Sequence, residues 1–231
     1  MASDVRSGPS APTLANFQSS HGSPIVLDTT LGAASMVKHP DAVVEIGARA
    51  GWQDNLSSIS AGKIAGASVP TWTLLQNGLY AYAFSAAAMN EVWVSFHIQH
   101  DYQPGTMFYP HVHWTTAGVN AGVCRWGIEY SFARGYAADV FPASTTIYLE
   151  QAATGVAYKH MITEAVEGAG VLIPTLETDG ILLTRVFRDG GHVNDTLTDV
   201  AFGLFVDIHY QSDGMLTNER NRTFTKKRGN F

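Results

Sequence analysis

Residues 92–114 read VWVSFHIQHDYQPGTMFYPHVHW, a stretch in which two segments of alternating side chains flank a turn. Residues 92–99 alternate between apolar side chains and polar or aromatic ones, which is the period of a half-buried β-strand. Residues 101–106 (DYQPGT) supply Pro-Gly turn chemistry, and residues 107–114 alternate again. The pattern predicts a β-hairpin with one apolar face and a second face of aromatic, amide and histidine side chains.

The second face of this predicted hairpin is too specialised to be a plain solvated surface. Charged residues make up only 15% of the chain and hydrophobic residues 45%, and a soluble chain with so few charges usually hides surface in an oligomer. We therefore expect a homo-oligomer, with a trimer as the expected state. The residues predicted to form its interface are Trp93, His97, Tyr109, His111 and His113.

Strand patterns recur along the chain at residues 71–75, 79–84, 123–132, 145–151, 158–165, 181–188 and 200–211. Asn77-Gly78 separates the first two and is a strong tight-turn signal. Trp126 is in register with the other apolar residues of its strand, which predicts that it lies in the core. The sequence favours an all-β fold, a β-sandwich of jelly-roll type with an extended N-terminal arm.

Three segments are expected. Residues 1–70 form an N-terminal arm and a poorly patterned segment, because their first third is rich in Ser, Ala, Pro and Gly without periodicity. Residues 71–212 form the sandwich. Residues 213–231 form a basic C-terminal tail, which is predicted to be solvated.

The composition also argues against several classes of protein. A net charge of −6 disfavours a direct role in nucleic-acid binding, which needs a basic surface. The single cysteine, Cys124, provides neither a disulfide framework nor a CxxC zinc site. No apolar run approaches membrane-spanning length, so no membrane partner is expected. We expect a protein made in the cytoplasm.

The histidines are the chemically suggestive residues. If neighbouring strands adjoin, His97, His111, His113 and Glu129 converge on one patch, where imidazole and carboxylate ligands would suit zinc. These four are weak candidates for a metal site. Histidines beside Trp and Tyr on a buried face are more often neutral interface residues, so the expectation is no metal and no cofactor.

Catalytic patterns are incomplete. Gly105, His111 and His113 have the spacing of the first cupin motif, but Ala117 and Gly118 stand where that motif has its glutamate. Cys124 points to the apolar face of its strand and does not read as a nucleophile. Carboxylates such as Asp195 are expected to be solvated or paired with arginines. We expect a protein that is not an enzyme, with a cupin-like metal-dependent enzyme as the least favoured alternative.

Beyond single motifs, whole strands carry a resemblance. The segments concerned are YPHVHW (109–114), WGIEYSFARGY (126–136), TTIYLEQAATG (145–155), KHMITE (159–164), DTLTD (195–199) and VDIHYQSD (206–213). Together they resemble a group of bacteriophage virion structural proteins of about this size. The resemblance implies a head decoration or cement protein, a head-fibre base, or a collar or tail component, and it carries over no site residues.

The expected function is therefore that of a non-enzymatic virion structural protein. It would decorate or cement the capsid, or act at the head–tail junction, with itself, the major capsid protein or other virion proteins as partners. The expected location is the virion. The alternative is a glycan-binding adsorption module, in which Trp72, Trp93, Tyr109 and Tyr136 stack on sugars.

Overall fold

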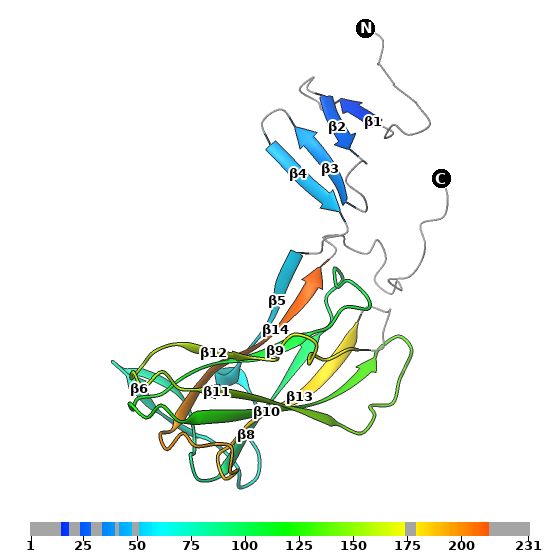
Figure 1. Ribbon diagram of the computed structural model, residues 1–231. Coiled ribbons are helices and arrows are strands. Elements are labelled where there is room, and N and C mark those ends of the chain that lie inside the picture. Colours follow the sequence, from blue (N-terminus) through cyan, green and yellow to red (C-terminus); the bar gives the residue numbers. More distant parts are fainter. Residues whose placement is uncertain are drawn as a thin grey trace. The chain divides into compact units, whose positions relative to one another are not determined.

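The computed structural model describes residues 51–173 and 179–212 with their side chains, and the backbone of the strands within residues 15–47 (Figure 1). Its contacts divide the chain into two compact units, Met1–Gly51 and Trp52–Phe231. Among the described residues, the helical structure is the 3₁₀ turn η1 (Ile59–Ala61), and no helix there has the length and hydropathy needed to cross a membrane. The described part of the chain is all-β, as predicted.

The first unit contains an antiparallel meander. Its strands pair in chain order: β1 (Ala15–Gln18), β2 (Pro24–Asp28), β3 (Ala34–His39) and β4 (Ala42–Gly47). Short β-branched runs such as Val43-Val44 favour extended backbone in this segment. The structure differs from the predicted extended arm because these residues pair with one another.

Within the described residues, the second unit forms two antiparallel sheets (Figure 1). Sheet I, in the order β11-β10-β13-β8, comprises β8 (Met89–His97), β10 (Val123–Arg134), β11 (Thr145–Ala152) and β13 (Gly180–Asp189). Sheet II, in the order β12-β9-β14-β7-β6, comprises β6 (Thr71–Gln76), β7 (Leu79–Phe84), β9 (Tyr109–Thr115), β12 (Met161–Glu164) and β14 (Ala201–Ser212). Strand β5 (Gly51–Ser58) pairs with β14.

The core lies between the two sheets. Trp126 of sheet I and Trp114 of sheet II are fully buried, with ring centroids 6.3 Å apart. Phe84 of β7 packs edge-on against Trp126 at 5.0 Å. The predicted core position of Trp126 is confirmed, and the apolar faces of the two sheets meet as in a β-sandwich.

The predicted hairpin over residues 92–114 is wrong. Among the described strands, β8 pairs with β13 in sheet I, whereas β9 pairs with β12 and β14 in sheet II. The connection crosses from one sheet to the other, where buried Tyr102 and Phe108 stack with centroids 4.7 Å apart. Each arm has an apolar face, but the two faces approach the same core from opposite sides.

The predicted turn at Asn77-Gly78 is confirmed. Strands β6 and β7 pair on either side of it. Asn77 has a φ of 50° and Gly78 a φ of 83°, and both lie in the left-handed region that a type I′ hairpin turn requires.

The sandwich begins before residue 71, where the sequence analysis placed its start. Strand β5 pairs with β14, and Ile59 is fully buried in the main core. Residues 52–70 therefore belong to the second unit. The predicted basic tail, residues 213–231, lies outside the described residues.

A β-bulge in β14 determines which side chains reach the outer face of sheet II. The register shifts between Gly203 and Phe205. Before the bulge, Phe202 packs with Ala81 and Ala83 in a small cluster separate from the main core. After the bulge, Val206 and Ile208 belong to the main core. A strand pattern is predicted over residues 200–211, but its side chains keep a regular alternation of faces only after the bulge, where Asp207 is paired with His111.

Candidate functional site

The candidate site lies on the outer face of sheet II, where three neighbouring strands place polar side chains in one row. His111 of β9 is paired with Asp207 of β14 on one side and with Glu164 of β12 on the other. Directly paired residues of antiparallel strands project to the same face. The neighbouring positions Val112 and Val206 are fully buried in the core. The register therefore places one imidazole between two carboxylates.

Two imidazoles and one carboxylate come together in this row. His111 Nε2 lies 3.1 Å from His113 Nε2 and 3.5 Å from Asp207 Oδ2. His113 Nε2 lies 3.0 Å from the same carboxylate oxygen. The side chains of His111, Asp207 and His113 are 2%, 7% and 19% exposed, so the cluster is largely withdrawn from water. On its outer side, His113 Nδ1 lies 2.8 Å from His160 Nε2.

A fourth imidazole lies beside this cluster on β14. The ring centroid of His209 is 4.2 Å from that of His111. His209 Nε2 lies 2.9 Å from Asp54 Oδ1, and His209 Nδ1 is hydrogen-bonded to Glu164 Oε1. Both ring nitrogens of His209 therefore already have carboxylate partners.

The two central histidines respond differently to this environment. Burial lowers the pKa of His111, but hydrogen bonding to Asp207 and the Tyr109 carbonyl, together with the negative charges of Asp207 and Glu164, outweighs burial, so the net shift is upward. For His113, burial and the neighbouring imidazoles outweigh the attraction of Asp207, so its pKa is lowered. The hydrogen bond to Glu167 raises the pKa of Tyr109.

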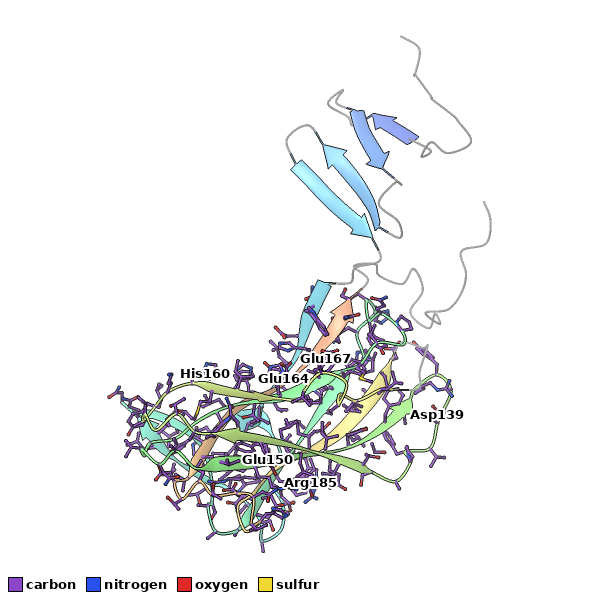
Figure 2. All side chains as sticks on the ribbon, viewed as in Figure 1. Asp139, Glu150, His160, Glu164, Glu167 and Arg185 are labelled. Carbon is purple, nitrogen blue, oxygen red and sulfur yellow. The ribbon has the colours of Figure 1, made fainter. Side chains whose placement is uncertain are left out.

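An open pocket of about 650 Å³ adjoins the histidines. Glu164 and Glu167 are labelled on this side of the sandwich in Figure 2. Trp52 packs edge-on against Tyr109 with centroids 5.7 Å apart. The pocket therefore combines an aromatic wall with carboxylates. Its lining residues are Trp52, Tyr109, Glu164, Ala165, Val166, Glu167 and His209.

The structure separates the four metal candidates. His111 and His113 lie together, but His97 lies on sheet I, 43% exposed, with its Nε2 2.9 Å from Asp179 Oδ1. Glu129, also on sheet I, pairs with Arg185 and accepts a hydrogen bond from Ser144. The predicted convergence is wrong because β8 and β10 belong to the other sheet, whose outer face points away from sheet II.

The five predicted interface residues divide in the same way. Trp93 and His97 lie on sheet I, whereas Tyr109, His111 and His113 lie on sheet II. Tyr109 is 8% and His111 1% exposed within a single chain. Their burial therefore requires no second copy, and the interface remains a prediction.

Sequence reasoning did not assign Asp207, Glu164, His160 or His209 to the site. The alternation of residues 200–211 does place Asp207 and His209 on an outer face. The missing information is strand order, because a sequence pattern identifies strands without saying which ones are neighbours.

Within the described residues, two groups of side chains have the donor types and spacing of a metal site. The first group is His111, His113 and Asp207, and the second is Asp54, His111 and His209. In each group, one ligand atom per residue lies within 4.8 Å of the others. Imidazole and carboxylate donors suit zinc and related first-row metals.

No protein-family model matches the chain, and no curated protein matches it. Among solved structures, the chain is similar to the crystal structure of dimeric latent PorU from Porphyromonas gingivalis, with 12% identity and a TM-score of 0.31. The match covers 94% of this chain and 21% of that chain, so this chain spans about a fifth of that protein's length. A similarity of this size defines no family and carries no functional argument.

Proposed function

We propose that the chain is a non-enzymatic bacteriophage virion structural protein that acts as a homo-oligomer, with a trimer as the expected state. In this proposal it decorates or cements the capsid, or acts at the head–tail junction, beside the major capsid protein or other virion proteins. The strand resemblance supports the virion assignment. The sandwich is of the jelly-roll type in this proposal, which is consistent with its two antiparallel sheets.

The observation that carries self-association is an apolar edge strand. Strand β6 stands at the end of the sheet II order and carries no charged residue over Thr71–Gln76. Trp72 and Leu74 on β6 are 49% and 51% exposed, and Tyr80 on β7 is 54% exposed. An uncharged, exposed apolar edge strand is a template for pairing with another chain. This observation supports association through the β6–β7 hairpin.

The partner that fits this edge is a second copy of the chain. Trp72 pairs with Tyr82 and Leu74 with Tyr80 across the hairpin, so the four side chains share one face. Monomeric proteins rarely leave such a contiguous apolar surface in water. The low content of charged residues, 15%, fits a chain that buries further surface in an assembly.

Sedimentation velocity of the full chain at micromolar concentration tests self-association. We expect an integral multiple of 24.9 kDa for the wild type, and a shift to monomer for Leu74→Lys, because a charge at the edge opposes pairing. Leu183→Lys is the matched control, since Leu183 is 46% exposed but lies on sheet I. A wild-type monomer contradicts the oligomer, and equal effects of the two variants contradict the β6 interface.

Mass spectrometry tests the virion assignment. Phage particles produced from the genome that encodes the chain are purified, and their proteins are quantified. We expect the chain at a fixed number of copies per particle. Its absence from particles that contain the other structural proteins contradicts the assignment, whatever the oligomeric state.

The pocket beside the histidines favours a second candidate, the glycan-binding adsorption module. Trp52 is 53% exposed and Glu167 lines the same pocket, which gives a stacking surface and a hydrogen-bond acceptor. A glycan array probed with the wild type and with Trp52→Ala tests this candidate. The control is Phe141→Ala, because Phe141 is also exposed but lies in the connection between β10 and β11 of sheet I. Binding that is lost only in Trp52→Ala supports it. No binding, or equal loss in both variants, contradicts it.

A further inference from the structure

The His111–His113–Asp207 cluster carries an inference that is independent of the virion assignment. We propose that these three side chains form a zinc-binding site on the outer face of sheet II. Two imidazole nitrogens and one carboxylate oxygen supply three ligands, and a tetrahedral zinc ion would take its fourth ligand from water or another donor. The cluster lies next to the pocket, because His209, which lines that pocket, has its ring centroid 4.2 Å from that of His111.

The distances between the three donor atoms fit a tetrahedral ion. Zinc bound to imidazole and carboxylate has bonds of about 2.0–2.1 Å, so two ligand atoms of a tetrahedron lie roughly 3.3 Å apart. The two Nε2 atoms are separated by 3.1 Å, and they lie 3.5 and 3.0 Å from Asp207 Oδ2. These three separations bracket the tetrahedral value without movement of any strand.

The contacts of the outer ring nitrogens are compatible with metal binding through both Nε2 atoms. His111 Nδ1 lies 3.4 Å from the Tyr109 carbonyl oxygen, which can only accept, so a hydrogen bond here requires the proton on Nδ1. His113 Nδ1 can donate likewise to His160 Nε2 at 2.8 Å. Metal binding requires both imidazoles to be neutral, and with each Nδ1 as the donor both Nε2 atoms are then left as ligands beside the carboxylate. Metal-bound histidines use this arrangement, in which the far nitrogen donates to a second group.

Asp207 supplies an independent observation. Its Oδ1 is buried and has no hydrogen-bond partner among the described residues, and the residue is 5% exposed. A buried acceptor without a partner is costly, and a buried carboxylate costs more. Among the described residues, the ion-pair partners of Asp207 are histidines and not lysine or arginine. A divalent cation at the triangle would offset this buried charge.

The other donor group is less suitable. Both nitrogens of His209 are already held by Asp54 and Glu164, so neither faces an empty position. Asp54 is 52% exposed, and binding through it gains less from a low-dielectric environment. The inference is therefore restricted to His111, His113 and Asp207, with His160 as a positioning residue that orients His113.

Calorimetric titration of ZnCl₂ into the full, untagged chain tests the site after treatment with chelator. The tag is omitted because a histidine tag binds zinc. We expect one zinc per chain with micromolar or tighter affinity, and Asp207→Asn should weaken binding by at least tenfold. His160→Ala should weaken it by roughly 10–100-fold, as outer-shell changes do. The controls Asp54→Asn and His97→Ala should bind as the wild type does.

If Asp207→Asn does not fold, binding of Co²⁺ in place of zinc tests the site with a second variant. The visible absorption of bound Co²⁺ reports its coordination geometry in the wild type. His113 is the most exposed of the three ligands, so His113→Gln is the variant expected to remain folded. It should lose the absorption of tetrahedral Co²⁺ while its circular dichroism stays that of the wild type. Absence of zinc binding in the folded wild type overturns the proposal. So does loss of binding in Asp54→Asn when Asp207→Asn and His113→Gln still bind. Neither result depends on whether the chain is found in particles.

Discussion

Among the described residues, charge is buried in two regions of the sandwich, and only one of these regions satisfies that charge with partners from the described residues. In the core, Arg188 and Asp195 are both fully buried. Arg188 donates to both oxygens of Asp195 and to the carbonyls of Phe84, Leu197 and Asp199. On the outer face of sheet II, Asp207 is almost as buried but leaves Oδ1 without a partner among the described residues.

The difference shows what each cluster can do. Arginine has five donors, no acceptor, and no lone pair for a metal. The five hydrogen bonds of Arg188 use all of these donors, so that region is complete and structural. Histidine has a nitrogen that can be a donor or a ligand, and the region with His111 and His113 has acceptors in excess. A buried cluster whose polar groups are all hydrogen-bonded stabilises the fold, whereas a buried cluster with excess acceptors can bind a metal ion.

The largest expected effect tests the completed cluster. Arg188→Ala leaves Asp195 buried and unpaired, so the free energy of unfolding should fall by about 3–5 kcal/mol. Urea denaturation followed by tryptophan fluorescence measures this. The control is Arg134→Ala, whose partner Asp139 is at the surface, and it should leave the midpoint nearly unchanged. Equal effects of the two variants contradict a structural role specific to Arg188.

Trp126→Ala should have an effect of similar size from a different cause. Trp126 lies directly opposite Arg188 in the β10–β13 ladder and is fully buried. The truncation leaves a cavity, and the expected cost is about 3–5 kcal/mol. Because the two residues are neighbours, the double variant should be non-additive by about 0.5–3 kcal/mol. A thermal midpoint close to that of the wild type would mean that the inward face of β10 is assigned incorrectly.

A smaller effect comes from the outer face of sheet I. Hydrogen bonding to Ser144 and the charge of Arg185 lower the pKa of Glu129 below its ordinary value of 4.5. Stabilisation by this carboxylate is therefore complete above about pH 4.5 and is lost as the pH falls through the lower, folded-state pKa. At pH 7, the free energy of unfolding of the wild type should exceed that of Glu129→Gln by up to about 1 kcal/mol.

Denaturation of both proteins between pH 7 and pH 3 checks this sign. The difference in the free energy of unfolding between the wild type and Glu129→Gln should become smaller as the pH falls, because only the wild type has a carboxylate at this position to protonate. A gap that stays constant or widens toward pH 3 would show that the Arg185–Glu129 pair does not stabilise the fold.

The sequence predicted the all-β class and several individual strand faces, whereas the jelly-roll order of the strands stays a prediction. Alternation identified β8, β9, β10 and β14, and Asn77-Gly78 identified the β6–β7 turn. The same patterns misplaced the stretch at residues 92–114, because two consecutive strands joined by a Pro-Gly turn look alike whether they pair or cross between sheets. Short strands within residues 15–47 were missed because they have too few alternating positions to stand out from a small-residue background.

The candidate site was predictable only in part. His111 and His113 stand two residues apart on one strand, so their shared face follows from sequence alone. Their partners depend on β14 and β12 being the neighbours of β9, and Asp207 comes from a strand that begins 86 residues after β9 ends. The bulge at Gly203–Phe205 also changes the faces within β14. Strand order and bulges are set by packing of the whole core, which no local pattern encodes.

Anomalous diffraction from a crystal of the zinc-loaded full chain tests whether His111, His113 and Asp207 bind the ion. Data collected on either side of the zinc absorption edge locate the ion without reference to any assumed ligand. We expect one peak at about 2.0–2.1 Å from the Nε2 atoms of His111 and His113 and from a carboxylate oxygen of Asp207. Well-ordered side chains of His111, His113 and Asp207 with no anomalous peak between them, or a peak at Asp54 and His209 instead, would contradict the proposed zinc site.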